Sequence, residues 1–221
     1  MRRKVLFEIM KDNEAFEVLG EIKRMMEKSS RFQAISGISI IIVGIYACIV
    51  SVVAGYLLGL TDWLTFLPES EGFRLNTPLR IRWAMLLAIA LFLLSFLTVT
   101  LMAYLKSRRH NLRFVVDKRM MQMAFNFMLP LGIGALLCIA LIHQGHYGLT
   151  SSIMLLFYGL ALVNCQHYTY PALRFLGYGE IVLGLIDCFL VHHALLFWFL
   201  GFGVLHIIFG VLYSIKYDRI K

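Results

Sequence analysis

The sequence contains little charge for its length. Asp, Glu, Lys and Arg make up only 15% of its 221 residues, whereas hydrophobic residues make up 60% and the mean hydropathy is +0.77. Soluble domains are about 45–50% apolar, so this chain has more apolar side chains than a soluble core can bury. The composition excludes an ordinary soluble protein. It predicts an all-α polytopic membrane protein, because backbone groups in lipid must be hydrogen-bonded within helices.

Cysteine is scarce, and the common catalytic motifs are missing. The four cysteines, Cys48, Cys138, Cys165 and Cys188, lie in or beside apolar segments and form no C-x-x-C pair, so we expect free thiols. No G-x-S-x-G, H-E-x-x-H, phosphate loop or dinucleotide fingerprint is present. An enzyme is disfavoured, a membrane hydrolase is not excluded, and no cofactor is required by the sequence.

Residues 1–32 lack the apolar core and cleavage site of a secretory signal, so the first span is expected to act as the targeting signal. Val18, Ile22, Met25 and Met26 recur at helical spacing among charged residues. This pattern is typical of an amphipathic helix lying along the membrane interface. A simple lead-in to the first span and a docking surface for a cytoplasmic protein partner remain alternatives.

Six apolar stretches approach the ~20 residues that a bilayer core requires. They are Gln33–Leu58, Trp83–Leu105, Met120–Ile142, Leu149–Cys165, Ala172–Leu190 and Ala194–Ser214. We predict six transmembrane helices in three consecutive hairpins, forming one domain over residues 33–214 and followed by a short cytoplasmic tail at 215–221.

The basic residues are distributed unevenly between the two sides of this topology. Eighteen of the 21 Lys and Arg residues fall before the first span, between spans two and three, after span four, or after span six. Cytoplasmic loops carry such an excess, so both termini are expected to be cytoplasmic in a multi-pass protein of the inner membrane. The net charge of +8 is therefore expected to attract anionic lipid headgroups, and nucleic-acid binding is not expected.

Glycines repeat at a spacing of seven residues on three spans. The pairs are Gly37 and Gly44, Gly177 and Gly184, and Gly203 and Gly210. Small residues let helix backbones approach closely, so these stripes are expected to mark helix packing inside the bundle. A homo-oligomer remains open.

Two ionisable residues are expected to face each other inside the membrane. Glu180 lies three residues after Gly177, and His206 lies three residues after Gly203, so both turn toward the packed side. At 1.5 Å per residue, each lies ~12 Å from the same surface on adjacent antiparallel spans. We predict that the pair is in hydrogen-bonding or one-water reach, either as a structural contact or as a protonatable relay or cation site.

Asp187 lies nearer the opposite surface and is expected to extend this relay. Four histidines are predicted near the same end, and an imidazole and carboxylate cluster could bind a transition metal. They are His143, His146, His192 and His193. Surface histidines are the simpler interpretation, and haem is a further alternative although no C-x-x-C-H motif is present.

The stretches "MEKSSRFQAISGISIIIVGIYA" and "LLFWFLGFGVLHIIFGVLYSIKYD" resemble a family of small six-span membrane proteins of bacteria, mostly Bacteroidota, with no assigned function. The segments "YGEIVLGL" and "GFGVLH" also resemble the pattern of that family. The resemblance implies a location in the cytoplasmic membrane and six spans. It implies no activity and no functional residue.

The first hypothesis for function is therefore a small transporter or channel whose pathway includes Glu180, His206 and Asp187. The alternative is a membrane scaffold or sensor that binds a cytoplasmic partner. A metal- or haem-binding membrane protein is a lower alternative.

Overall fold

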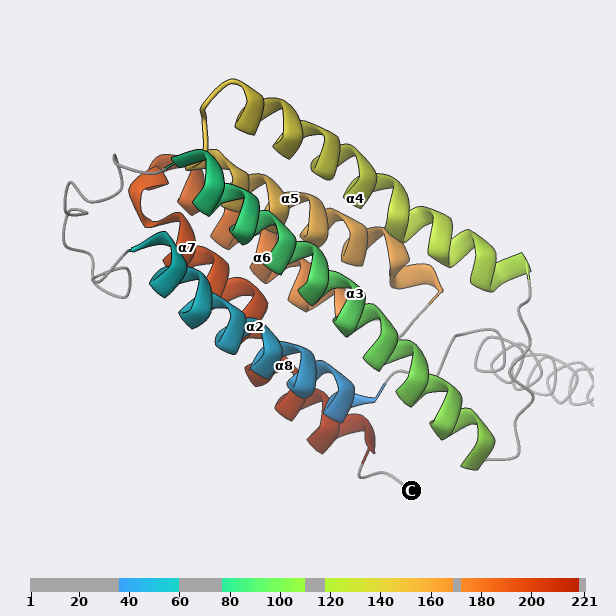
Figure 1. The fold of residues 1–221 in the computed structure, drawn as a ribbon. Helices are drawn as coiled ribbons and strands as arrows, with labels where there is room; N and C mark the ends of the chain where they lie inside the picture. The colour runs from blue at the N-terminus through green and yellow to red at the C-terminus, as the bar shows by residue number, and fades with distance from the viewer. Residues whose placement is uncertain (1–35, 60–76, 110–117, 169–171, 219–221) are drawn as a thin grey trace, which may run out of the picture.

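The computed structural model describes residues 36–59, 77–109, 118–168 and 172–218. These residues form a bundle of six helical rods and contain no strand (Figure 1). The first five rods are α2 (Gly37–Leu58), α3 (Thr77–Arg109), α4 (Lys118–His143), α5 (Leu149–Asn164), which continues into the short η2 (Cys165–His167), and α6 (Leu173–Phe189). The predicted N-terminal amphipathic helix lies outside the described residues.

The sixth rod is a continuous helix in which α-helical and π-helical turns alternate. It begins with a short 3₁₀ turn and contains two π-helical stretches. Its segments are η3 (Val191–His193), α7 (Ala194–Trp198), η4 (Phe199–Leu205), α8 (His206–Tyr213) and η5 (Ser214–Asp218), of which η4 and η5 are π-helical.

Four rods have the length and composition to cross a membrane. These are Gly37–Leu58, Arg82–Arg108, Met120–His143 and Val191–Lys216. The apolar α5 has 16 residues, and α6 has 17 residues that include two carboxylates. Six helices are therefore present among the described residues, and four of them meet the ordinary requirements for a membrane span.

Sequential neighbours pack as hairpins, and the first and last rods close the bundle. α3 packs on α2, α4 on α5, and α6 on both α5 and the last rod. α2 also packs along η4 and α8, a contact between segments more than 140 residues apart. The interior of the bundle thus lies among α2, α5, α6 and the last rod, with α3 and α4 on its flanks (Figure 1).

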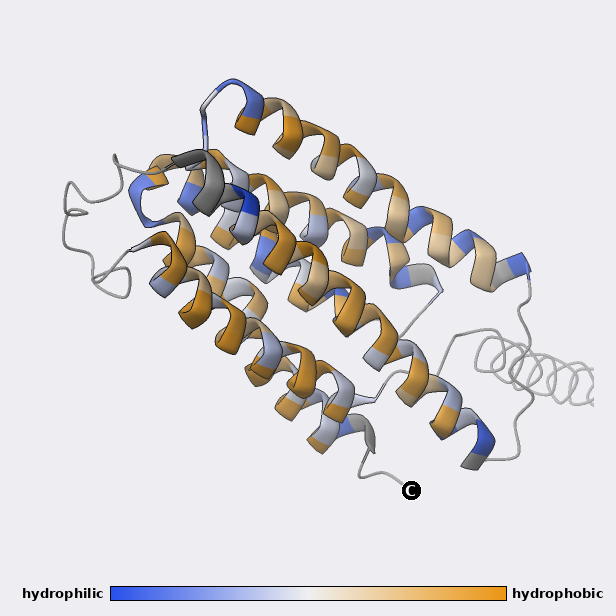
Figure 2. Ribbon diagram, in the orientation of Figure 1, coloured by the Kyte–Doolittle hydropathy of each residue, from blue (hydrophilic) through white to orange (hydrophobic). Residues whose placement is uncertain are grey.

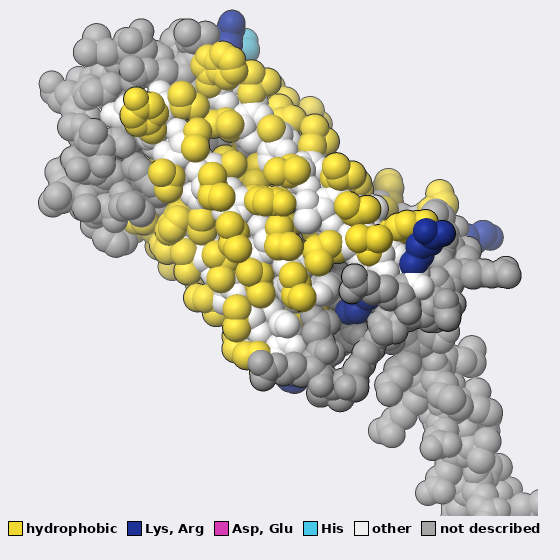
Figure 3. All heavy atoms as spheres, turned by 60° about the horizontal axis from the view of Figure 1, so that its bottom comes forward, with side chains coloured by type: hydrophobic (Ala, Val, Ile, Leu, Met, Phe, Trp, Pro, Cys, Tyr) yellow, Lys and Arg dark blue, Asp and Glu magenta, His cyan; other side chains and the backbone are white. Residues whose placement is uncertain are grey.

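The flanking helices are mostly exposed. Only 6% of the most apolar part of α3 and 11% of that of α4 is buried, against 39% for α2 and 33% for the last rod. Hydrophobic residues nevertheless run along the helices, while hydrophilic residues collect mainly at their ends (Figure 2). A space-filling view shows the resulting broad apolar face (Figure 3). Such a surface has the character of one that faces lipid.

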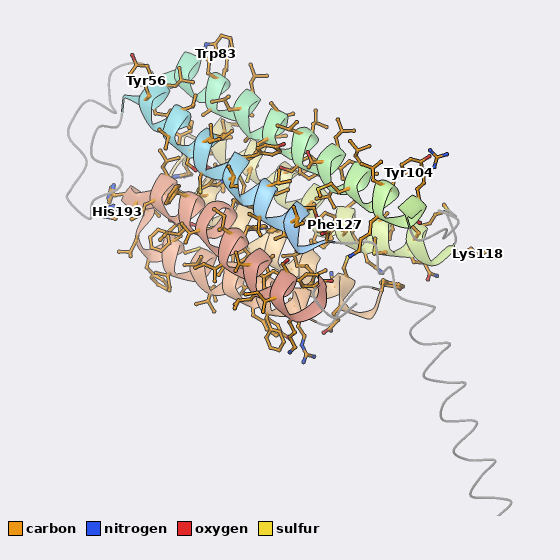
Figure 4. All side chains as sticks on the ribbon, turned by 90° about the horizontal axis from the view of Figure 1, so that it is seen from below. Tyr56, Trp83, Tyr104, Lys118, Phe127 and His193 are labelled. Carbon is orange, nitrogen blue, oxygen red and sulfur yellow. The ribbon has the colours of Figure 1, made fainter. Side chains whose placement is uncertain are left out.

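The described basic residues gather at one end of the bundle. Tyr56, Trp83 and His193 mark one end, and Tyr104 and Lys118 mark the other (Figure 4). The basic residues at the helix termini on the Lys118 end are Lys106, Arg108, Lys118, Arg174 and Lys216. Arg82 lies at the opposite end, so the asymmetry read from the sequence corresponds to the two ends of the structure.

The glycine stripes lie where helices meet. A Cβ atom at Gly37 would lie 2.7 Å from the backbone nitrogen of Ser214, and one at Gly44 would lie 2.9 Å from the carbonyl oxygen of Gly203. A Cβ at Gly210 would lie 3.0 Å from the carbonyl oxygen of Gly37. These distances show backbone-to-backbone packing of α2 on the last rod, which any larger side chain would prevent.

The second glycine stripe joins α6 to α5. A Cβ at Gly177 would lie 2.8 Å from the carbonyl oxygen of Gly159, and one at Gly184 would lie 2.9 Å from Cγ of Leu156. Gly159 was not singled out in the sequence because it has no glycine seven residues away. The α5/α6 interface is the close contact that positions the buried carboxylates.

Candidate functional site: a buried glutamate, histidine and tyrosine

Glu180 and His206 meet in the interior of the bundle. The side chain of Glu180 is fully buried and that of His206 is 2% exposed. Oε1 of Glu180 lies 3.2 Å from Nδ1 of His206. The matched depths in the sequence predicted this contact, and the structure contains it because α6 and the last rod pack side by side.

Both nitrogens of His206 have partners, and these partners fix its tautomer. Nδ1 lies 3.0 Å from the carbonyl oxygen of Gly201, and Nε2 lies 2.8 Å from the hydroxyl of Tyr158. A carbonyl oxygen only accepts, so Nδ1 must carry a hydrogen and donate it. In the neutral imidazole, Nε2 then accepts from the Tyr158 hydroxyl. In the charged imidazolium, Nε2 donates to the same hydroxyl.

The π-helical stretch η4 shapes the site from the His206 side. His206 follows this stretch directly, and its Nδ1 contacts the carbonyl of the residue five positions earlier. π-helical turns change which residues share a helix face and are frequent at functional sites. Here the stretch places Gly201 and His206 together against Glu180.

Gly201 makes room for the carboxylate. A Cβ atom at this position would lie 2.6 Å from Oε2 of Glu180 and would overlap Cδ2 of Leu155. No other amino acid therefore fits here without displacing one of these side chains. Gly201 did not belong to a seven-residue repeat, and the sequence analysis missed it.

The carboxylate of Glu180 is incompletely satisfied. Within the described parts of the chain, neither oxygen has a hydrogen-bond partner, and the 3.2 Å approach of Oε1 to Nδ1 is an ion-pair contact without hydrogen-bond geometry. Nδ1 instead directs its hydrogen to Gly201. A buried carboxylate without hydrogen bonds is costly to keep, so its presence here calls for an explanation beyond packing.

Aromatic rings surround the cluster. The ring of Tyr158 lies 5.2 Å from that of Phe202 and 6.1 Å from that of Phe127, measured between centroids. The imidazole of His206 lies 6.1 Å from the ring of Phe202 at an interplanar angle of 29°. These rings surround the polar groups with apolar surface, which strengthens electrostatic interactions among Glu180, His206 and Tyr158.

Asp187 forms a second buried polar group two turns further along α6. It is fully buried, and its Oδ2 accepts a hydrogen bond of 2.9 Å from the Ser152 hydroxyl. Its Oδ1 has no hydrogen-bond partner among the described residues. The adjacent Ser151 donates to the carbonyl oxygen of Ala194 at 2.8 Å. Asp187 does not contact the Glu180 cluster, since seven residues of helix separate the two carboxylates by ~10 Å.

The metal site considered for the histidines is not formed. In the part of the chain that the structure describes, no three His, Cys, Asp or Glu side chains lie together as a metal site would require. His143, His146 and His192 are exposed and His193 is half-buried, whereas Asp187 is fully buried beneath them. His143, His146 and His192 are therefore surface residues at this end of the bundle, and the expected cluster of the four histidines with Asp187 is not formed among the described residues.

Tyr158 and Ser152 are the polar partners that the sequence analysis missed. Both lie within an apolar stretch, which is the same signal that identified Glu180. A hydroxyl in an apolar stretch is a weaker signal than a carboxylate, because a single hydroxyl is far less costly to bury.

Comparison with models of protein families, with curated proteins and with solved structures finds no match to this chain.

Proposed function

We propose that this protein is a small transporter or channel for protons or monovalent cations, and that Glu180 is the group that binds the transported ion. The observation that carries the proposal is the fully buried Glu180 carboxylate, which lies 3.2 Å from His206 yet lacks a hydrogen-bond partner among the described residues. Ionisable residues inside membrane helices are costly and commonly mark ion pathways.

Three protonatable side chains contact one another in a row at this site. Tyr158 contacts Nε2 of His206, and Nδ1 of the same ring contacts Glu180. The Nδ1 edge of the His206 ring lies 3.2 Å from Oε1 of Glu180, which places an N–H dipole beside the carboxylate. Tyr158 fixes the orientation of the imidazole from the other side. Glu180 would therefore bind the ion, with His206 and Tyr158 as positioning residues.

The proposal includes a membrane topology. Six helices would cross the inner membrane, with the end that carries Lys118 and both termini on the cytoplasmic side. The excess of Lys and Arg at that end supports this orientation, because it follows the positive-inside rule. The two shorter helices, α5 and α6, have 16 and 17 residues. α6 turns its two carboxylates inward and exposes large apolar side chains such as Val182 and Leu185, so its outer face would lie against lipid.

Ion flux through reconstituted protein tests the assignment. Purified protein is placed in liposomes with a trapped pH indicator, and a potassium diffusion potential drives proton entry; parallel samples carry sodium or potassium gradients. Glu180→Gln keeps the shape and removes the charge. We expect it to lower the flux at least about tenfold, which corresponds to ~1.4 kcal/mol of barrier.

Thr98→Val is the matched control, because Thr98 lies on the flanking helix α3 and its hydroxyl donates to the carbonyl oxygen of Leu94, one turn earlier on the same helix. This variant should transport like the wild type. Infrared difference spectra between two pH values provide a second readout, because a protonated Glu180 gives a carboxylic acid band that Glu180→Gln must remove. Undiminished flux in folded Glu180→Gln protein would reject the proposal.

A further inference from the structure

The α5/α6 interface contains two polar layers with one apolar layer between them. In the first layer, Ser152 of α5 bonds to Asp187 of α6. In the other, Tyr158 of α5 approaches Glu180 of α6 through His206. Both helices are antiparallel neighbours, so the residues midway between the two layers face each other as well.

Leu155 occupies that middle layer. It lies three residues from Ser152 and three from Tyr158, on the same face of α5, and it is fully buried. Opposite it lies Gly184, four residues after Glu180 and three before Asp187. A Cβ atom at Gly184 would lie 3.1 Å from Cβ of Leu155, so the leucine packs directly against the backbone of α6.

The end of the leucine side chain and the Glu180 carboxylate both lie beside Gly201. A Cβ atom at Gly201 would overlap Cδ2 of Leu155 and would also lie 2.6 Å from Oε2 of Glu180. These two groups therefore border the same small space beside Gly201. Leu155 contacts α6 with its stem and the last rod with its tip, and so it fills the interface between the two polar layers.

An apolar side chain at this place interrupts any chain of hydrogen bonds. The two carboxylates are ~10 Å apart along α6, a separation that a proton or hydrated cation crosses only through water or polar groups. A fully buried leucine packed against glycine backbone offers neither. Hydrophobic constrictions of this kind act as gates in membrane channels.

We propose that Leu155 is the barrier that separates an outer ion-binding position at Asp187 from the inner position at Glu180, and that its movement controls ion passage between them. This inference rests on the proposed function and adds a regulatory element to it. Asp187, whose Oδ1 has no hydrogen-bond partner among the described residues, holds the ion on one side of the barrier, and Glu180 receives it on the other.

The experiment compares proton leak in four single variants and one double variant in the same liposomes. Leu155→Ala removes most of the barrier, and Leu155→Val removes less and is the variant that keeps the test decisive if the alanine protein does not fold. Leu155→Met conserves volume and should keep the barrier. Leu162→Ala is the matched control, because Leu162 is a buried leucine two turns further along α5 that packs against Gly177, outside the space between the carboxylates.

We expect Leu155→Ala to raise the proton leak about tenfold and Leu155→Val to raise it less, with Leu155→Met and Leu162→Ala near the wild-type rate. Combining Leu155→Ala with Glu180→Gln should abolish the added leak, because the opened path still leads through Glu180. A wild-type leak in folded Leu155→Ala or Leu155→Val protein would overturn the inference, as would a leak that persists in the double variant.

These outcomes are distinct from a failure of the proposed function. If Glu180→Gln by itself leaves the flux unchanged, the proposed function fails and the barrier inference falls with it. If Glu180→Gln abolishes flux while the Leu155 variants behave like the wild type, only the barrier inference is wrong.

Discussion

Replacing Gly201 by alanine tests the geometry of the site most directly. The added methyl group would lie 2.6 Å from Oε2 of Glu180 and would overlap Cδ2 of Leu155. Normal contacts between carbon atoms are about 3.5–4.0 Å, so the carboxylate, the leucine or the helix backbone must shift by about 1 Å. Overpacking of this kind costs about 1–3 kcal/mol.

A second glycine supplies the reference for this substitution. Gly132 of α4 also lies within a helix, but a Cβ atom there would meet nothing within 4 Å. Alanine in a helix interior is about 0.5–1 kcal/mol more favourable than glycine, and both variants share this gain. The difference between Gly201→Ala and Gly132→Ala therefore isolates the steric cost, and we expect it to be about 1–3 kcal/mol.

Unfolding by sodium dodecyl sulfate in mixed micelles, followed by circular dichroism, measures this difference. Gly201→Ala should unfold at the same detergent fraction as the wild type or at a lower one. Gly132→Ala should unfold at the same detergent fraction as the wild type or at a higher one. In the infrared, the Glu180 band should also move in Gly201→Ala, because the carboxylate is pushed from its position beside His206. Equal stability of the two variants would show that Glu180 and Leu155 do not crowd Gly201.

Two further substitutions probe neighbouring contacts by the same unfolding assay. Tyr158→Phe should cost about 1–3 kcal/mol, because it leaves Nε2 of His206 buried without the partner that lies 2.8 Å away. Tyr178→Phe, at a tyrosine of α6 that is 46% exposed, should cost almost nothing, and a similar loss in both would contradict the proposed role of the hydroxyl. Gly37→Ala should cost about 1–3 kcal/mol, because its methyl group would lie 2.7 Å from the backbone nitrogen of Ser214 and would force α2 away from the last rod. If Gly37→Ala were as stable as Gly132→Ala, the close packing of α2 on the last rod would be refuted.

The depth of Glu180 and His206 could be predicted because it depends on local quantities. Distance from the end of a helix follows from the rise per residue, and the face of a helix follows from its period. Both residues also lie one turn from a glycine of a packing stripe, and glycine indicates the side on which another helix approaches. The prediction that they lie within reach of each other also assumed that the last two helices pack side by side, which the structure has, with the two side chains 3.2 Å apart.

The histidines of the helix ends show where this reasoning stops. His143, His146 and His192 lie at the same end of the bundle as Asp187, as the sequence predicted, but they point outward while Asp187 is buried. Two residues can lie at the same height along the membrane normal and still be far apart within the plane of the membrane. A metal site requires agreement in all three dimensions, which depends on how the helices are rotated about their axes.

The sequence by itself determined that the chain is a bundle of apolar helices, which ends carry the basic residues, and that Glu180, Asp187 and His206 turn away from lipid. Composition, helix period and charge distribution are sufficient for these conclusions. Only the tertiary structure decided that Tyr158 completes the contact with His206, that Gly201 and the π-helical turns make space for Glu180, and that Leu155 divides the two carboxylates. These features arise where three helices meet, and their side chains are brought together by packing between segments that are distant in the sequence.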